Sequence, residues 1–149
     1  MYQINSFIFD KIPIMKKLTS TYYSAGAFNV AMLVLRVGLA CLMIPHGYDK
    51  LVNFAKYSNQ FINFLGLGSD VSLALVIFAE FFCSIFLMVG LFSRLVCIPL
   101  IVAMFVAVWK AHNLEVFGEG EHAAMYVIGF FTILLVGPGK ASIDGMVGK

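Results

Sequence analysis

The sequence is short of charged residues. Only 12% of its 149 residues are Asp, Glu, Lys or Arg, whereas 61% are hydrophobic. A soluble domain carries about a quarter charged residues, so these few could not cover the surface of a water-soluble protein of this size. We therefore expect lipid to surround much of a single domain. The net charge of +2 is too small to indicate binding to nucleic acid.

Paired cysteines and enzyme signatures are also missing. Cys41, Cys83 and Cys97 lie singly in hydrophobic runs, without a CxxC pair, a disulfide framework or metal-ligand spacing. Buried, unreactive thiols are the simplest interpretation. No nucleophile elbow, phosphate-binding loop, dinucleotide fingerprint or metal-hydrolase motif is present. These absences argue against a self-contained enzyme of a familiar type.

Four hydrophobic runs predict an all-α membrane protein, a bundle of four transmembrane helices. They cover residues 27–47, 71–92, 95–109 and 123–136. Because a helix rises about 1.5 Å per residue, a run of about 20 apolar residues crosses the hydrocarbon core. The fourth run is short for a lipid-facing helix.

Residues 48–68, between the first two runs, are too polar to cross a membrane. Polar and apolar residues each recur there every three or four positions, offset by one: Asn53, Lys56, Gln60 and Asn63 against Phe54, Tyr57, Phe61 and Leu65. This spacing predicts an amphipathic helix that lies in the membrane interface.

The basic residues predict the orientation, because cytoplasmic segments carry an excess of Lys and Arg. With the N-terminus in the cytoplasm, that side and the inner halves of the helices hold Lys11, Lys16, Lys17, Arg36, Arg94, Lys140 and Lys149, and the outer side holds Lys50, Lys56 and Lys110. We expect both termini to be cytoplasmic. Residues 1–26 then form a leader, 27–140 the transmembrane domain and 141–149 a short tail.

Two charged residues fall inside the predicted spans, Arg36 in the first and Glu80 in the second. Each costs about 2.5–3.5 kcal/mol on insertion scales, so both should face the bundle interior and meet one another or water. Counting from the ends of the spans places them at compatible depths. Either the pair fixes the helix register, or Glu80 carries a proton or binds a ligand with its pKa tuned by Arg36.

A second group of ionisable residues lies at the side opposite the termini. His46 and Lys50 are four residues apart and share a helical face, and His112, His122 and Tyr126 belong to the same side in this topology. The histidines are either interfacial hydrogen-bonding residues or part of a polar vestibule that binds a ligand. Their spacings fit no established metal-ligand pattern, so we expect no metal ion.

Several short motifs, taken in order, resemble the DoxX family of small bacterial membrane proteins. They are Leu35-Arg36-Val37-Gly38, His46-Gly47-Tyr48-Asp49-Lys50-Leu51, Ala79-Glu80, Gly90-Leu91-Phe92-Ser93-Arg94, the stretch from Met104 to His112, Glu121-His122-Ala123-Ala124, and Gly137-Pro138-Gly139-Lys140-Ala141-Ser142-Ile143-Asp144. The resemblance covers the chain from about Val34 onwards. It implies four transmembrane helices in a bacterial inner membrane.

The resemblance also implies a function. Members of the family are associated with thiosulfate oxidation and electron transfer to quinone, and others with membrane oxidoreductase assemblies in oxidative-stress defence. The residues at the family's polar positions are Arg36, His46, Lys50, Glu80, His112 and His122. Because the chain has no cofactor-binding motif, an oxidoreductase role would require a bound quinone or a partner subunit that carries the cofactor.

Three functions are open at this point. The leading hypothesis is a membrane subunit that binds a quinone or another small amphipathic molecule between its helices and assists or anchors an oxidoreductase. The alternatives are a carrier or binding protein for lipids or small solutes, and a structural accessory of a larger complex. We expect no covalent cofactor, and contacts with the lipid bilayer and with a partner subunit or a second copy of the chain.

Overall fold

The protein is helical throughout the part that the structure describes. That structure is a computed structural model, and it describes residues 20–111 and 114–148, which contain no strand. The helices are α3 (Ala25–Val52), α4 (Phe54–Ser58), α5 (Ser69–Ile77), η1 (Phe78–Cys83), α6 (Ser84–Val89), α7 (Ser93–Val106), η2 (Ala107–Ala111), α8 (Glu121–Val136) and α9 (Ile143–Val147). The elements η1 and η2 are π-helical turns, with hydrogen bonds between residues five apart.

Three continuous helical segments are long and apolar enough to cross a membrane. They are Ala25–Val52, Ser69–Val89 and Ser93–Lys110, and they agree with the first three predicted spans. The fourth apolar helix, α8, has 16 residues. It rises about 24 Å, which is less than the thickness of a hydrocarbon core, so its crossing stays a prediction.

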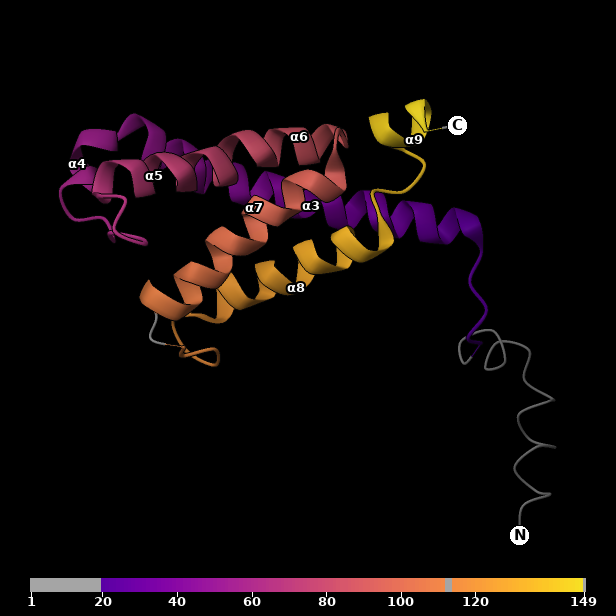
Figure 1. Ribbon diagram of the computed structural model, residues 1–149. Coiled ribbons are helices and arrows are strands. Elements are labelled where there is room, and N and C mark those ends of the chain that lie inside the picture. The colour runs from indigo at the N-terminus through magenta and orange to yellow at the C-terminus, as the bar shows by residue number, and fades with distance from the viewer. Residues whose placement is uncertain (1–19, 112–113, 149) are drawn as a thin grey trace, which may run out of the picture.

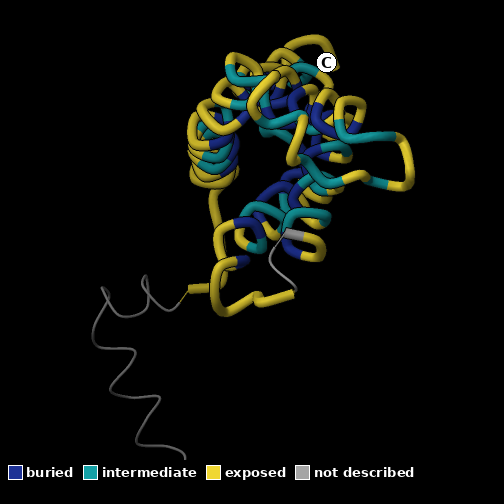
Figure 2. The backbone as a smooth tube through the Cα atoms, turned by 90° about the vertical axis from the view of Figure 1, so that its left-hand side faces the viewer, coloured by how far each residue is buried: buried dark blue, intermediate teal, exposed yellow. Residues whose placement is uncertain are grey.

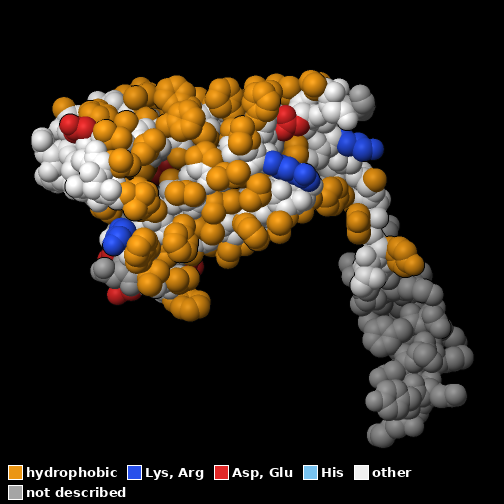
Figure 3. All heavy atoms as spheres, in the orientation of Figure 1, with side chains coloured by type: hydrophobic (Ala, Val, Ile, Leu, Met, Phe, Trp, Pro, Cys, Tyr) orange, Lys and Arg blue, Asp and Glu red, His pale blue; other side chains and the backbone are white. Residues whose placement is uncertain are grey.

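Hydrophobic side chains cover most of the face seen in Figure 3, and the charged side chains on that face lie mostly toward the two ends of the molecule. Buried positions face the inside of the bundle (Figure 2). The core combines side chains from four helices, among them Met43 of α3, Leu87 of α6, Leu100 of α7 and Phe130 of α8. An apolar outer surface around an apolar core is expected for helices that pack in lipid.

The helix α3 packs antiparallel to η1 and α6. A Cβ atom on Gly47 would lie 2.5 Å from the backbone nitrogen of Phe81 and 2.7 Å from the carbonyl carbon of Glu80. The two backbones therefore touch at this level. Further along the pair, the guanidinium of Arg36 lies against Gly90. These contacts fix the register, with Gly47 level with Glu80 and Arg36 level with Gly90.

The two ends of the bundle differ in their composition and are named here by one residue each. The Arg36 end holds the turn between α6 and α7, the start of α3 and α9. The Lys50 end holds α4 and the start of α5. The helices α7 and α8 pack along each other and diverge from α5 toward the Lys50 end (Figure 1).

The segment predicted as one amphipathic helix over residues 48–68 is divided in the structure. Its first part continues α3 to Val52, and α4 covers only Phe54–Ser58. Leu65, Gly66 and Gly68 then adopt positive φ angles, which an α-helix cannot contain. The two glycines, which favour this backbone, override the amphipathic spacing. Residues 59–68 are called the covering loop below, and a position in the membrane interface stays a prediction.

Replacing Gly47 by Ala should push α3 away from η1. The added methyl group would meet backbone atoms, which cannot rotate away, so we expect a loss of about 1–3 kcal/mol in stability. Gly38 is the matched control, because no atom lies within 4 Å of the Cβ it would gain, and Ala there should be neutral or stabilising. Thermal unfolding in detergent, followed by circular dichroism, measures both. Equal melting temperatures would contradict the proposed backbone contact.

Candidate ligand-binding site

Glu80 is buried in the middle of the second helical segment, within the π-helix η1. Only 4% of the residue is exposed. A π-helical turn interrupts the regular hydrogen bonding of a helix and occurs frequently at functional sites. A carboxylate at this depth is costly unless a cation or hydrogen-bond donors face it.

Lys50 supplies that cation. Its Nζ atom donates a hydrogen bond to Oε2 of Glu80 over 2.6 Å, and the two side chains are 23% and 5% exposed. Lys50 follows Gly47 by about one helical turn. The close contact of Gly47 with η1 therefore brings Lys50 beside Glu80, and the ion pair joins the first two segments inside the bundle.

The expectation that Arg36 and Glu80 meet was wrong. Arg36 is buried, but it lies against Gly90, and its Nη2 atom donates to the carbonyl oxygen of Ala141 over 2.6 Å. Arg36 is about 21 Å from Lys50 along the axis of α3. The depth estimate failed because α3 extends beyond the predicted end at residue 47, and Glu80 is therefore level with a later part of the helix.

Asp144 holds the C-terminal segment to the turn between α6 and α7. Its carboxylate accepts the backbone N–H groups of Phe92 and Ser93, each over 2.8 Å, and its own N–H donates to the carbonyl of Gly90. Burial raises the pKa of Asp144, but these hydrogen bonds and the charge of Arg36 outweigh burial and lower the pKa overall. This arrangement gives Arg36 and Asp144 a structural role at the Arg36 end.

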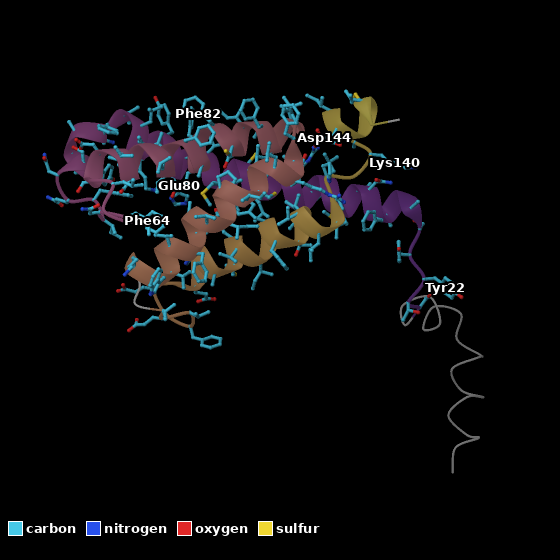
Figure 4. The ribbon with its side chains drawn as sticks, in the orientation of Figure 1. Tyr22, Phe64, Glu80, Phe82, Lys140 and Asp144 are labelled. Carbon is cyan, nitrogen blue, oxygen red and sulfur yellow. The ribbon has the colours of Figure 1, made fainter. Side chains whose placement is uncertain are left out.

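A cavity of about 520 Å³ adjoins the Lys50–Glu80 pair. The segment α5–η1 and the helix α7 form its walls, and side chains of the covering loop line it as well. Besides the ion pair, its lining consists of Phe61, Ile62, Phe64, Ser72, Leu75, Val76, Phe78, Ala79, Pro99, Val102, Ala103, Val106 and Ala107. Figure 4 shows Glu80 and Phe64 on the side of α5 that faces α7. The cavity is therefore apolar except for one ion pair and one hydroxyl group.

Ser72 attaches the covering loop to α5. Its Oγ atom accepts the N–H of Phe64 over 3.0 Å and donates to the carbonyl of Gly68 over 2.7 Å. The N–H of Gly68 in turn donates to the side chain of Asn63 over 2.9 Å. Sequence reasoning missed both Ser72 and the loop. The available signal was the pair of glycines at positions 66 and 68, which interrupts the helical pattern.

The other predicted site residues do not line this cavity. His46 and His122 are exposed, and His112 lies outside the described residues. Tyr126 is partly buried and stacks on Phe130 with ring centroids 5.7 Å apart. It also interacts electrostatically with Glu80. Within residues 20–111 and 114–148, no three His, Cys, Asp or Glu side chains gather as metal ligands would.

Comparison with protein-family models gives a match to DoxX over residues 31–113, more than half of the chain. The chain belongs to the DoxX family. The resemblance seen in its motifs is thereby confirmed. No curated protein and no solved structure matches it. In this DoxX protein the matched region begins within α3 and ends just after η2, so it contains Lys50, Glu80 and both walls of the cavity, whereas α8 lies beyond it.

Replacing Asp144 by Asn in this DoxX protein should weaken the attachment of the C-terminal segment. A lowered folded-state pKa means that the carboxylate stabilises the protein above its ordinary pKa of 3.8 and that this contribution is lost as the pH falls through the folded value. At neutral pH we expect a loss of about 1–3 kcal/mol. The difference in melting temperature from the wild type should persist down to about pH 5 and shrink below about pH 4.

The exposed carboxylate Glu115 provides the control for this experiment. Its replacement by Gln removes one negative charge without removing a hydrogen bond to the α6–α7 turn. A melting temperature equally affected by both substitutions at neutral pH would show that net charge, and not the attachment by Asp144, is responsible.

Proposed function

We propose that this DoxX-family membrane protein binds a quinone, or another small molecule with a neutral polar head and an apolar body, at the Lys50–Glu80 pair. We further propose that it acts as a membrane subunit of an oxidoreductase system. The observation that carries the proposal is a partly buried ion pair in the wall of an otherwise apolar cavity. A few polar groups in an apolar pocket are what orients a bound small molecule.

The ion pair suits a neutral head that both accepts and donates hydrogen bonds. The Lys50 ammonium has three N–H donors, and Glu80 uses one of them. The others can donate to a quinone carbonyl, and the Glu80 carboxylate can accept from a quinol hydroxyl. A charged head is disfavoured, because an anion would have to compete with Glu80 for Lys50 and a cation with Lys50 for Glu80.

The cavity has the dimensions of a small-molecule site. Its volume of about 520 Å³ lies within the range of about 300–1,000 Å³ that is usual for such sites. The aromatic ring of a quinone can pack against the side chains of Phe61, Phe64 and Phe78, which line the cavity. Shape and polarity together therefore support an aromatic or conjugated head group.

Electron transfer in this proposal requires a partner subunit. The sequence contains no cofactor-binding motif, and two of its cysteines, Cys83 and Cys97, are buried in the core. The protein would hold the quinone at a defined depth and orientation, and the partner would carry the redox cofactor. Proton transfer to or from the bound quinone is a role that the Glu80 carboxylate can perform.

We propose that the protein spans a bacterial inner membrane four times, with α8 as the fourth crossing and both termini in the cytoplasm. The chain enters α3 at the Arg36 end, and α9 lies at the same end (Figure 1). Arg94 and Lys140 also belong to this end, and the basic residues of positions 11–17 precede α3. The excess of basic residues supports a cytoplasmic location for the Arg36 end.

The test is retention of quinone by Glu80→Gln and Lys50→Met variants, measured by native mass spectrometry after gentle solubilisation. Each variant removes a charged hydrogen-bonding group, so we expect retention to fall about tenfold or more. Lys56→Met is the control, because Lys56 is an exposed lysine of α4 that does not line the cavity. Equal retention by all three variants would contradict the proposal.

A double variant separates binding from stability. Replacing a buried ion pair by apolar residues of similar volume is often neutral for folding. Lys50→Met combined with Glu80→Met should therefore keep the melting temperature near that of the wild type and still lose the quinone. Full retention of quinone by the stable double variant would show that the pair has only a structural role.

A further inference from the structure

The cavity beside Lys50 and Glu80 reaches the surface of the protein between α5 and α7. Leu75, Phe78 and Val102 line it, yet these residues are 50%, 51% and 49% exposed. All three lie in helical segments that are long and apolar enough to cross a membrane. In the proposed topology, the medium at this opening is hydrocarbon. The opening bordered by these three residues is called the lateral groove.

The covering loop lines the cavity on the side that faces water in the proposed topology. Phe61, Ile62 and Phe64 of the loop line the cavity at the Lys50 end. Ser72, which holds the loop by two hydrogen bonds, is only 2% exposed. A molecule arriving from water would have to displace this attached apolar loop, whereas a molecule dissolved in the bilayer meets the lateral groove directly.

We propose that the ligand of the Lys50–Glu80 pair is a lipid-phase molecule that enters through the lateral groove. Its neutral polar head lies at the ion pair, and its long apolar tail passes through the groove into the bilayer. This inference rests on the proposed function and narrows it to ligands with a tail. It excludes water-soluble solutes that would enter beneath the covering loop.

The size of the cavity favours a single hydrocarbon chain over a helix of a partner protein. A helix with its side chains is about 10 Å across, and even two turns of it would exceed a volume of about 520 Å³. On the α7 side, the small residues Pro99, Ala103 and Ala107 line the cavity. A flexible chain of methylene groups fits such a space without moving either wall.

The tail affects which ligands bind because it must fit into the groove, and not because its burial there is driven by the hydrophobic effect. Because lipid is as apolar as the groove, a tail that moves from one to the other gains only packing contacts. Side chains that narrow the groove should therefore exclude a tailed ligand sterically. A ligand that has the same head without the tail should still reach Lys50 and Glu80.

The experiment compares two benzoquinones with the same ring, one with a long isoprenoid tail and one without a tail. Both are titrated into the protein in nanodiscs, with saturable quenching of the single tryptophan, Trp109, as the signal. The groove is narrowed by Leu75→Phe with Val102→Phe. The control is Ile85→Phe with Ile98→Phe, two exposed positions on the same helical segments that do not line the cavity.

We expect the narrowed groove to weaken binding of the tailed quinone at least about tenfold and to change binding of the tail-less quinone less than about twofold. The control should bind both as the wild type does. If the narrowed variant binds the tailed quinone as tightly as the wild type does, entry through the lateral groove is overturned, and the proposed head site at Lys50 and Glu80 is unaffected. Failure of the wild type to bind either quinone would overturn the proposed function itself.

Two further results complete the test. Melting temperatures show whether the narrowed variant is folded, and Val102→Phe alone provides a milder substitution that should act in the same direction. Cross-linking from the groove to a co-purifying protein, with no bound quinone, would overturn the proposal in favour of a partner helix.

Discussion

The close contact between Gly47 and the backbone of η1 determines where the polar groups of this bundle lie. Without a side chain at position 47, α3 comes within direct contact of the backbone of Glu80 and Phe81. Helices in lipid have little hydrophobic driving force between them, so close packing and polar pairs hold them together. Both occur here within about one helical turn, because Lys50 follows Gly47 and meets Glu80. The backbone contact and the ion pair are thus one structural unit.

Buried charge is stabilised at two separate levels of the molecule. At the Arg36 end, the guanidinium of Arg36 bonds the carbonyl of Ala141 and interacts with the charge of Asp144, and Gly90 leaves room for it. Asp144 and Ala141 connect the C-terminal segment to the α6–α7 turn and to α3. At the Lys50 end, the ion pair borders the cavity between α5 and α7. The same physical requirement, that a charge in a low dielectric needs a partner, therefore supports a structural role at one level and a proposed binding role at the other.

The arrangement of the helices explains the cavity beside the Lys50–Glu80 pair. The helix α7 packs along α8 and diverges from α5 toward the Lys50 end (Figure 1), whereas α3 packs against η1. The covering loop spans the space near the start of α5 through its bonds to Ser72. An apolar cavity beside a polar pair follows from this divergence. The cavity and the pair are the features on which the proposed function rests.

The fold class, the family and the positions of three long apolar helices follow from the sequence alone, because each depends on composition and local order along the chain. The sequence also showed that Arg36 and Glu80 must be buried, since a charge within an apolar run has few other places to lie. For residues 48–68 it predicted a single helix, because the helical spacing of polar and apolar residues was given more weight than Gly66 and Gly68. The pairing of Glu80 with Lys50 and the contact of Arg36 with the C-terminal segment became known from the three-dimensional arrangement of the helices. Pairing depends on the register between helices, and register is set by close contacts such as that of Gly47, which leave no periodic signal in the sequence.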